Sequence, residues 1–204
     1  MAVCVSGRGS NLQALIDAIS TGRLDARIVL VASSRPDAPA VERARSTGIP
    51  VAGFPVTNAT RAEAQGAMGG AIRDAGARLV VLAGYDRILA DAFWDLLGDV
   101  PVINIHPSLL PAFGGLSGLK VHEAVIASGA SESGATVHTA HKGRLDEGEI
   151  LAQRRVPVRP GDTPQVLAAR VLETEHEAIV DAVARFVSQA ALAGRTSRRT
   201  GPGM

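Results

Sequence analysis

An amide and an imidazole lie two residues apart in the segment 104–111, which reads Asn-Ile-His-Pro-Ser-Leu-Leu-Pro. Alternate residues of a strand point to the same face, so Asn104 and His106 are expected to face the same way. Pro107 has no N–H to donate to a strand ladder and ends the regular structure there. An amide can hold a carbonyl oxygen, and an imidazole can give or take a proton near neutral pH. The pattern predicts a reactive site at a strand end, where ligands bind in open α/β sheets.

A carboxylate follows downstream at Asp146, within the glycine-flanked loop 143–148. A carboxylate close to His106 is expected to raise the pKa of the imidazole and to keep it protonated as an acid. A lone histidine at a strand end has a structural role about as often as a catalytic one. Here His106 is accompanied by Asn104 and Asp146, and Pro107 ends the strand directly after it. This combination favours a catalytic role for His106.

A glycine-rich loop, Ser6-Gly-Arg-Gly-Ser-Asn-Leu12, connects a predicted strand to a predicted helix. Glycines let the backbone approach an anion closely, and the helix N-terminus directs free amides at it. Leu12 stands where a dinucleotide fingerprint has its third glycine, and residues 33–35 include no acid to hold a ribose. A single phosphate is therefore the better prediction than a pyrophosphate. The alternative is a tight strand-to-helix turn with a side-chain cap.

A third segment, 84–89 (Gly-Tyr-Asp-Arg-Ile-Leu), follows another buried strand. The backbone groups of residues 86–89 could recognise a planar heterocycle along its edge. In the alternative interpretation Arg87 is a solvated loop charge, and Ile88 and Leu89 belong to the core.

Other chemistry receives less support from the residues. His138 and His141 form a His-x-x-His pair, but a metal site in a loop without cysteines is a weak hypothesis. His122 and His176 lie on predicted helices and are expected to be partly exposed. Cys4 lies inside a predicted buried strand and is expected to be inert.

The elements that must position these residues alternate between strands and helices. This alternation predicts an α/β fold with a doubly wound, mostly parallel sheet and flanking helices. Strands are predicted at 2–6, 27–33, 50–54, 78–83, 101–105, 134–140 and 150–158. Helices are predicted at 11–20, 39–46, 61–74 with Thr60 as N-cap, 120–128 and 164–187.

Composition narrows the classes of partner. The net charge is +1 and aromatic residues make up 3%, which argues against a nucleic-acid surface. No apolar run is long enough to span a membrane, and no secretory signal pattern is present. With a single cysteine, the chain is predicted to be a cytoplasmic protein. Its oligomeric state is left open between monomer and homodimer.

The segment 104–111 together with Asp146 resembles the signature of folate-dependent formyltransferases. The N-terminal motif Gly7-Arg-Gly-Ser-Asn-Leu-Gln-Ala-Leu15 narrows this resemblance to the phosphoribosylglycinamide formyltransferase family. The similarity runs from about residue 3 to about residue 187. It implies a Rossmann-like formyltransferase fold in one domain, 1–187, with a phosphate-binding half, 1–100, and a catalytic and folate-binding half, 101–187. Residues 188–204 are expected to form a flexible tail.

The resemblance also implies site roles. The implied catalytic residues are Asn104, His106 and Asp146. The implied phosphate and ribose contacts are Gly9, Ser10, Asn11 and Glu175. The implied folate contacts are Arg61, Asp86, Arg87, Ile88, Leu89, Asn104, Lys142, Gly143, Arg144 and Leu145. Two loops, 113–120 and 139–146, are longer than the family pattern, and His141 stands where an acid is common.

The implied activity is transfer of the formyl group of 10-formyltetrahydrofolate to the glycyl amine of glycinamide ribonucleotide, in purine biosynthesis. Both are small molecules, and no metal is implied. The alternative is a formyltetrahydrofolate deformylase, in which water replaces the amine. A strand starting at residue 2 is expected to leave no room for the N-terminal domain of deformylases. The short C-terminus is expected to exclude the RNA-binding domain of methionyl-tRNA formyltransferase. A non-catalytic NAD-binding module is disfavoured by Leu12.

Overall fold

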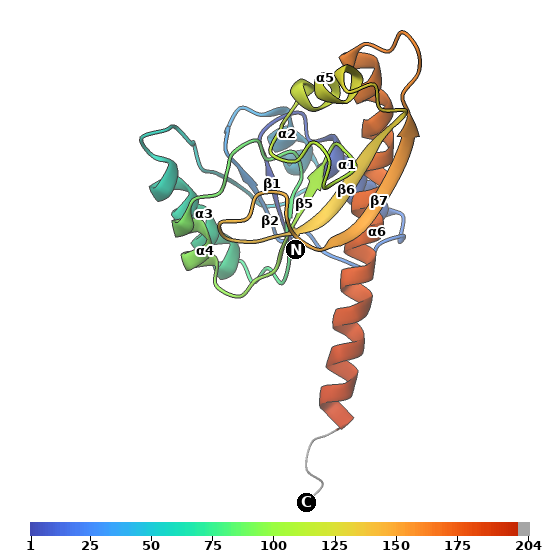
Figure 1. Ribbon diagram of the computed structural model, residues 1–204. Helices are drawn as coiled ribbons and strands as arrows, with labels where there is room; N and C mark the ends of the chain where they lie inside the picture. The colour runs from blue at the N-terminus through green and yellow to red at the C-terminus, as the bar shows by residue number, and fades with distance from the viewer. Residues whose placement is uncertain (200–204) are drawn as a thin grey trace, which may run out of the picture.

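The structure, a computed structural model, describes residues 1–199, with side chains through Gln189 (Figure 1). Its centre is a seven-stranded sheet in the order β3-β2-β1-β4-β5-β6-β7. The first five strands pair in parallel, and β6 and β7 join the sheet antiparallel. The strands are β1 Ala2–Val5, β2 Leu30–Ser33, β3 Val51–Gly53, β4 Val80–Leu82, β5 Val102–His106, β6 Glu132–Ala140 and β7 Ile150–Pro157. The predicted doubly wound, mostly parallel sheet is confirmed.

Helices cover both faces of this sheet. They are α1 Ser10–Ser20, α2 Pro39–Ser46, α3 Arg61–Asp74, α4 Asp91–Leu97, α5 Leu119–Ala127 and α6 Pro164–Arg199. The pair α3 and α4 packs together on one face. On the other face α6 packs against α1, α5 and the antiparallel strands β6 and β7. No helix in the part of the chain that the structure describes is long and apolar enough to cross a membrane.

Strand alternation divides the core into two layers. In β1, Val3 and Val5 join the layer under α1 and α6, whereas Ala2 and Cys4 join the layer under α3 and α4. All four side chains are fully buried, as expected for a parallel strand covered on both faces. Burying a side chain such as Val5 contributes roughly 1.5–3 kcal/mol.

Among the differences from the sequence prediction are the start of the second strand and an additional helix. The second strand begins at Leu30 rather than at residue 27, because β1 begins at Ala2, directly opposite Leu30. The helix α4 was not predicted. Its signals are weak but present: Phe93 and Leu97 are buried four residues apart, and Asp91 lies in its first turn.

The last helix is longer than predicted. It continues through residue 199, across most of the segment expected to be a flexible tail, and Figure 1 shows it projecting beyond the sheet. The segment 188–199 is rich in alanine and contains Gln, Leu and Arg, which are strong helix formers. Gly194 costs only about 1 kcal/mol in a helix interior. The rest of the predicted tail, 200–204, lies outside the described residues.

Thr60 occupies the N-cap position of α3 as predicted, but its side chain does not cap the helix. Its hydroxyl oxygen instead accepts a hydrogen bond from the backbone N–H of Thr57 at 3.2 Å and bonds the Thr57 hydroxyl at 2.9 Å. A local turn between two threonines has replaced the cap.

Candidate active site

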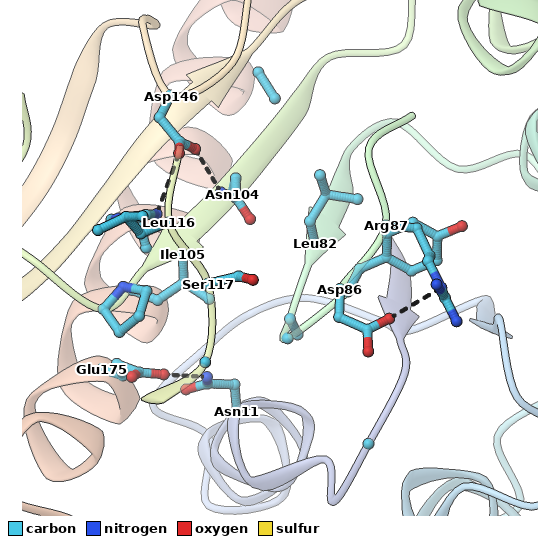
Figure 2. A pocket seen from close by; sticks show the side chains of 18 of the residues that line it. Asn11, Leu82, Asp86, Arg87, Asn104, Ile105, Leu116, Ser117, Asp146 and Glu175 are labelled. Carbon is cyan, nitrogen blue, oxygen red and sulfur yellow. Dashed lines mark hydrogen bonds and ion pairs between the residues drawn. The ribbon is translucent and has the colours of Figure 1, made fainter. Parts of the chain in front are cut away.

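The carboxyl ends of β1, β4 and β5 open onto a single cavity of about 1160 Å³. The order of the sheet places β1 between β2 and β4, which is the point where the winding direction reverses and where α/β sheets bind ligands. Figure 2 shows Asn104 and Asp146 at one end of this cavity, Asn11 and Glu175 at the other, and Asp86 on a further side. The three motifs predicted from the sequence therefore share one site.

At the end of β5, a carboxylate joins the amide and the imidazole. Asp146 Oδ2 lies 3.4 Å from His106 Nδ1, and Asp146 Oδ1 lies 3.5 Å from Asn104 Nδ2. The side chains of His106 and Asp146 are only 4% and 7% exposed. The backbone N–H of Gly115 donates a 2.8 Å hydrogen bond to Asp146 and fixes the carboxylate. The structure thus brings together the three residues that the sequence analysis selected.

Sequence reasoning missed a fourth member of this cluster, His138. Its Nε2 lies 3.2 Å from Asn104 Nδ2 and 3.4 Å from Asp146 Oδ1. Its Nδ1 donates to the Thr139 carbonyl at 2.9 Å, which fixes the ring so that Nε2 faces the Asn104 amide and the Asp146 carboxylate. Only the antiparallel register, which pairs Asn104 with His138, reveals this contact.

Two residues of the cluster have an unusual backbone. Within residues 1–199, Phe113 and Asp146 are the only non-glycine residues with positive φ, at 62° and 56°. Both contact His106: the Phe113 carbonyl accepts from Nε2 at 3.2 Å, and Asp146 faces Nδ1. Such backbone costs of order 1–3 kcal/mol per residue and concentrates at functional sites. Here the two positive-φ residues place one oxygen beside each nitrogen of the His106 imidazole.

The pKa of His106 differs in sign from the sequence prediction. Burial of the ring lowers this pKa below its ordinary value, and Asp146 and the Phe113 carbonyl oppose the shift without reversing it. The sequence showed the carboxylate but not the depth of burial. In the free protein the imidazole is therefore mainly neutral near pH 7.

Asp146 is ionised at that pH. Burial acts to raise its pKa, but the contact with His138, the hydrogen bond from Gly115 and the neighbouring imidazoles together lower it below the ordinary aspartate value. The cluster thus holds one carboxylate beside two imidazoles.

At the opposite end of the cavity, Gly9 sits at the N-cap of α1 with φ 73°. No side chain caps this helix, so the amides of its first turn remain available to an anion. Asn11 donates from Nδ2 to Glu175 Oε2 at 2.7 Å, which ties the loop to α6. Its Oδ1 is buried without a partner among the described residues. Burial raises the pKa of Glu175 above its ordinary value, and the bond from Asn11 opposes that shift.

The segment 86–89 lines the cavity, as the resemblance implied. The backbone N–H of Asp86 donates to the Ser6 hydroxyl at 3.1 Å, and its carboxylate pairs with Arg35. Ile88 is 61% exposed, so the alternative that placed it in the core is wrong.

Not every residue implied as a folate contact lines this cavity. Gly143, Arg144 and Leu145 do, whereas Arg61 is the exposed first residue of α3 and is absent from the lining. Lys142 turns towards α4 and pairs with Asp95 at 2.7 Å. Their folate contacts remain predictions.

Two expectations about isolated side chains have clear outcomes. His122 is 4% exposed, so its expected surface position is wrong; it lies in α5 on the wall of the cavity. Burial raises the pKa of Cys4 to about 12, which fits the predicted inert thiol. Within the described residues there is no group of three or more potential ligands arranged for a metal ion.

Comparison with known proteins identifies the family of the chain. The family described as Formyl transferase matches residues 1–183. The chain belongs to the formyl transferase family. A phosphoribosylglycinamide formyltransferase of Haemophilus influenzae is 37% identical over 178 residues, covering 87% of the chain and 82% of that relative. The solved structure of glycinamide ribonucleotide transformylase 1 from Symbiobacterium toebii superposes with a TM-score of 0.83 at 36% identity, covering 92% of the chain and 87% of that structure.

Plant relatives of this formyl transferase are longer. The chloroplastic phosphoribosylglycinamide formyltransferase of Arabidopsis thaliana is 42% identical over 191 residues, which cover 90% of the chain but 63% of the plant protein. The chain thus spans about three fifths of that relative. The family resemblance and the fold predicted from the two motifs are both confirmed.

Proposed function

We propose that this formyl transferase moves the formyl group of 10-formyltetrahydrofolate to the glycyl amine of glycinamide ribonucleotide, a step of purine biosynthesis. One observation carries the proposal. The Asn104–His106–Asp146 cluster and the anion-binding end of α1 face a single cavity, so a phosphate-bearing substrate held at Gly9 extends towards the catalytic cluster. Relatives named for this activity support it.

The reaction joins the two substrates directly. The amine nitrogen attacks the formyl carbon, a new C–N bond forms, and the C–N bond to the folate nitrogen breaks. The tetrahedral intermediate between these steps carries an oxyanion, which prepositioned donors stabilise. Asn104 Nδ2 lies 3.2 Å from His138 Nε2 and makes only a long 3.5 Å hydrogen bond to Asp146, and the oxyanion takes over that long bond as the acceptor of the N–H.

The proton must travel from the attacking amine to the departing folate nitrogen. His106 is neutral in the free protein, but its two nitrogens face the Phe113 carbonyl and the Asp146 carboxylate. An oxyanion beside the ring favours the imidazolium further, because an additional negative charge raises its pKa. His106 therefore becomes charged when a proton donor is needed, and Asp146 stabilises that charge.

The folate is expected to bind along the segment 86–89 and the loop 143–145. Exposed apolar side chains at both places, Ile88 at 61% and Leu145 at 50%, offer surface to a planar ring. The folate serves as co-substrate, and the proposed reaction needs no metal. The cytoplasmic location stays a prediction from the sequence, and the oligomeric state stays open between monomer and homodimer.

The first test measures turnover in two variants. His106→Ala and Asp146→Asn are each expected to lower kcat by about 10²–10³-fold, while glycinamide ribonucleotide still binds in calorimetry. Glu147→Gln is the matched control, because it removes the neighbouring exposed acid of the same loop. Near wild-type kcat in both cluster variants contradicts the catalytic assignment.

The second test separates the transferase from a deformylase. Folate product is followed by absorbance with 10-formyltetrahydrofolate alone and then with added glycinamide ribonucleotide. Product that appears only with the ribonucleotide supports formyl transfer. Product at the same rate without it shows that water is the acceptor and overturns the proposal.

A further inference from the structure

A third histidine of the cavity wall, His122, has no role in the mechanism above. It lies in the first half of α5, just after the glycine-rich segment 114–118, and it lines the cavity. It is 4% exposed, and its Nδ1 is buried without a hydrogen-bond partner in the part of the chain that the structure describes. Leaving a buried polar atom unpaired costs about 1–3 kcal/mol, so the unpaired Nδ1 constrains which tautomer the ring adopts.

The unpaired Nδ1 determines where the proton of the ring resides. A proton on Nδ1 would be a buried donor without an acceptor, which is the costly arrangement. The neutral ring therefore carries its proton on Nε2, and Nδ1 keeps a lone pair. Burial and the nearby His106 both lower the pKa of His122, in agreement with an uncharged ring near pH 7. The ring is thus a neutral N–H donor on the cavity wall.

The position of α5 indicates which substrate this donor meets. α5 packs against α6, and α6 contributes Glu175, which bonds Asn11 of the phosphate-binding loop. His122 and the catalytic cluster also line the same cavity. Between the phosphate end and the reacting end lies the sugar and amide part of a ribonucleotide, which is rich in uncharged acceptor oxygens.

We propose that His122 donates a hydrogen bond from Nε2 to an uncharged oxygen of the ribonucleotide, on its ribose or its amide carbonyl. This inference rests on the proposed function. It assigns His122 to substrate binding rather than to proton transfer, because the buried Nδ1 has no partner among the described residues to which a proton could pass. The bond contributes to affinity for the ribonucleotide and not to affinity for the folate.

The test compares substitutions that remove or keep the donor. His122→Phe keeps a ring and removes the N–H, whereas His122→Gln keeps an N–H donor near the position of Nε2. Calorimetry of glycinamide ribonucleotide is expected to show the Kd rising about 3- to 10-fold in the Phe variant, with most of the affinity restored in the Gln variant. The KM for 10-formyltetrahydrofolate and the Kd for inorganic phosphate are expected to stay within about twofold of wild type in both variants.

His176→Phe is the matched control. Its Nε2 is also buried without a partner and burial also lowers its pKa, but it does not line the cavity. Thermal unfolding checks each fold, and removing an unpaired buried nitrogen is expected to leave the unfolding temperature of His122→Phe unchanged or higher.

An unchanged Kd for the ribonucleotide in His122→Phe, with wild-type protein active, overturns the His122 assignment alone. Equal losses in His122→Phe and His176→Phe overturn it too, because they indicate a general packing effect. A wild-type protein that binds no ribonucleotide overturns this inference together with the proposed function.

Discussion

Replacing Gly9 by alanine should damage both stability and phosphate binding. A Cβ at this position would lie 2.6 Å from the Cβ of Ala40 and 2.9 Å from its Cα, so the loop or α2 must move. Gly9 also has φ 73°, where a side chain costs about 1–2 kcal/mol. Overpacking a close contact costs a further 1–3 kcal/mol or so. Together these effects should reduce the free energy of unfolding by roughly 2–5 kcal/mol.

For a chain of this size, that loss lowers the unfolding temperature by roughly 4–20 °C. Differential scanning calorimetry measures this shift. Calorimetric titration with glycinamide ribonucleotide should show weaker binding, because the phosphate-binding loop is displaced. Gly7→Ala is the control for stability, because a Cβ there meets nothing within 4 Å. If Gly9→Ala unfolds at the same temperature as Gly7→Ala, the close approach of the loop to α2 is refuted.

Three further outcomes are expected. Burial lowers the pKa of His106, His122 and His176 below their ordinary value of 6.5, so the unfolded chain binds their protons more readily. These three groups should lower the free energy of unfolding as pH drops below about 6.5, and they outnumber Glu175, whose raised pKa acts in the opposite direction. Equal urea midpoints at about pH 7.5 and 5.5 would contradict this. Cys4, whose pKa burial raises to about 12, should resist iodoacetamide at about pH 8 until urea unfolds the chain, and rapid labelling of the folded protein would show that the thiol is accessible. Asn11→Asp places a second carboxylate at the 2.7 Å contact with Glu175, and the added negative charge in the loop repels phosphate. Calorimetry should show phosphate binding at least about tenfold weaker. Unchanged affinity would mean that the loop is not the anion site.

The parts of the site that could be predicted from the sequence are those encoded by neighbouring residues. Asn104 and His106 share one strand end, so alternation alone predicts that they face the same way. The glycine loop before α1 is equally local. Asp146 was selected only as a candidate carboxylate, and the fold then placed it 3.4 Å from His106.

The parts that could not be predicted depend on contacts between distant segments. His138 reaches Asn104 because β6 runs antiparallel to β5 in a particular register, and strand patterning does not specify that register. The sign of the pKa shift at His106 depends on how deeply the ring is buried, which composition does not report. The same holds for His122, which was expected at the surface and which the fold buries.

The hydrogen bond between Asn11 and Glu175 has a consequence for how the protein acquires activity. These residues are 164 positions apart, so during synthesis the loop emerges long before the helix α6 that completes its binding site. A nascent chain or a proteolytic fragment that ends before α6 carries the whole catalytic cluster but lacks the acid that holds the anion-binding loop. Competence to bind the ribonucleotide therefore arises only once α6 has packed against the loop.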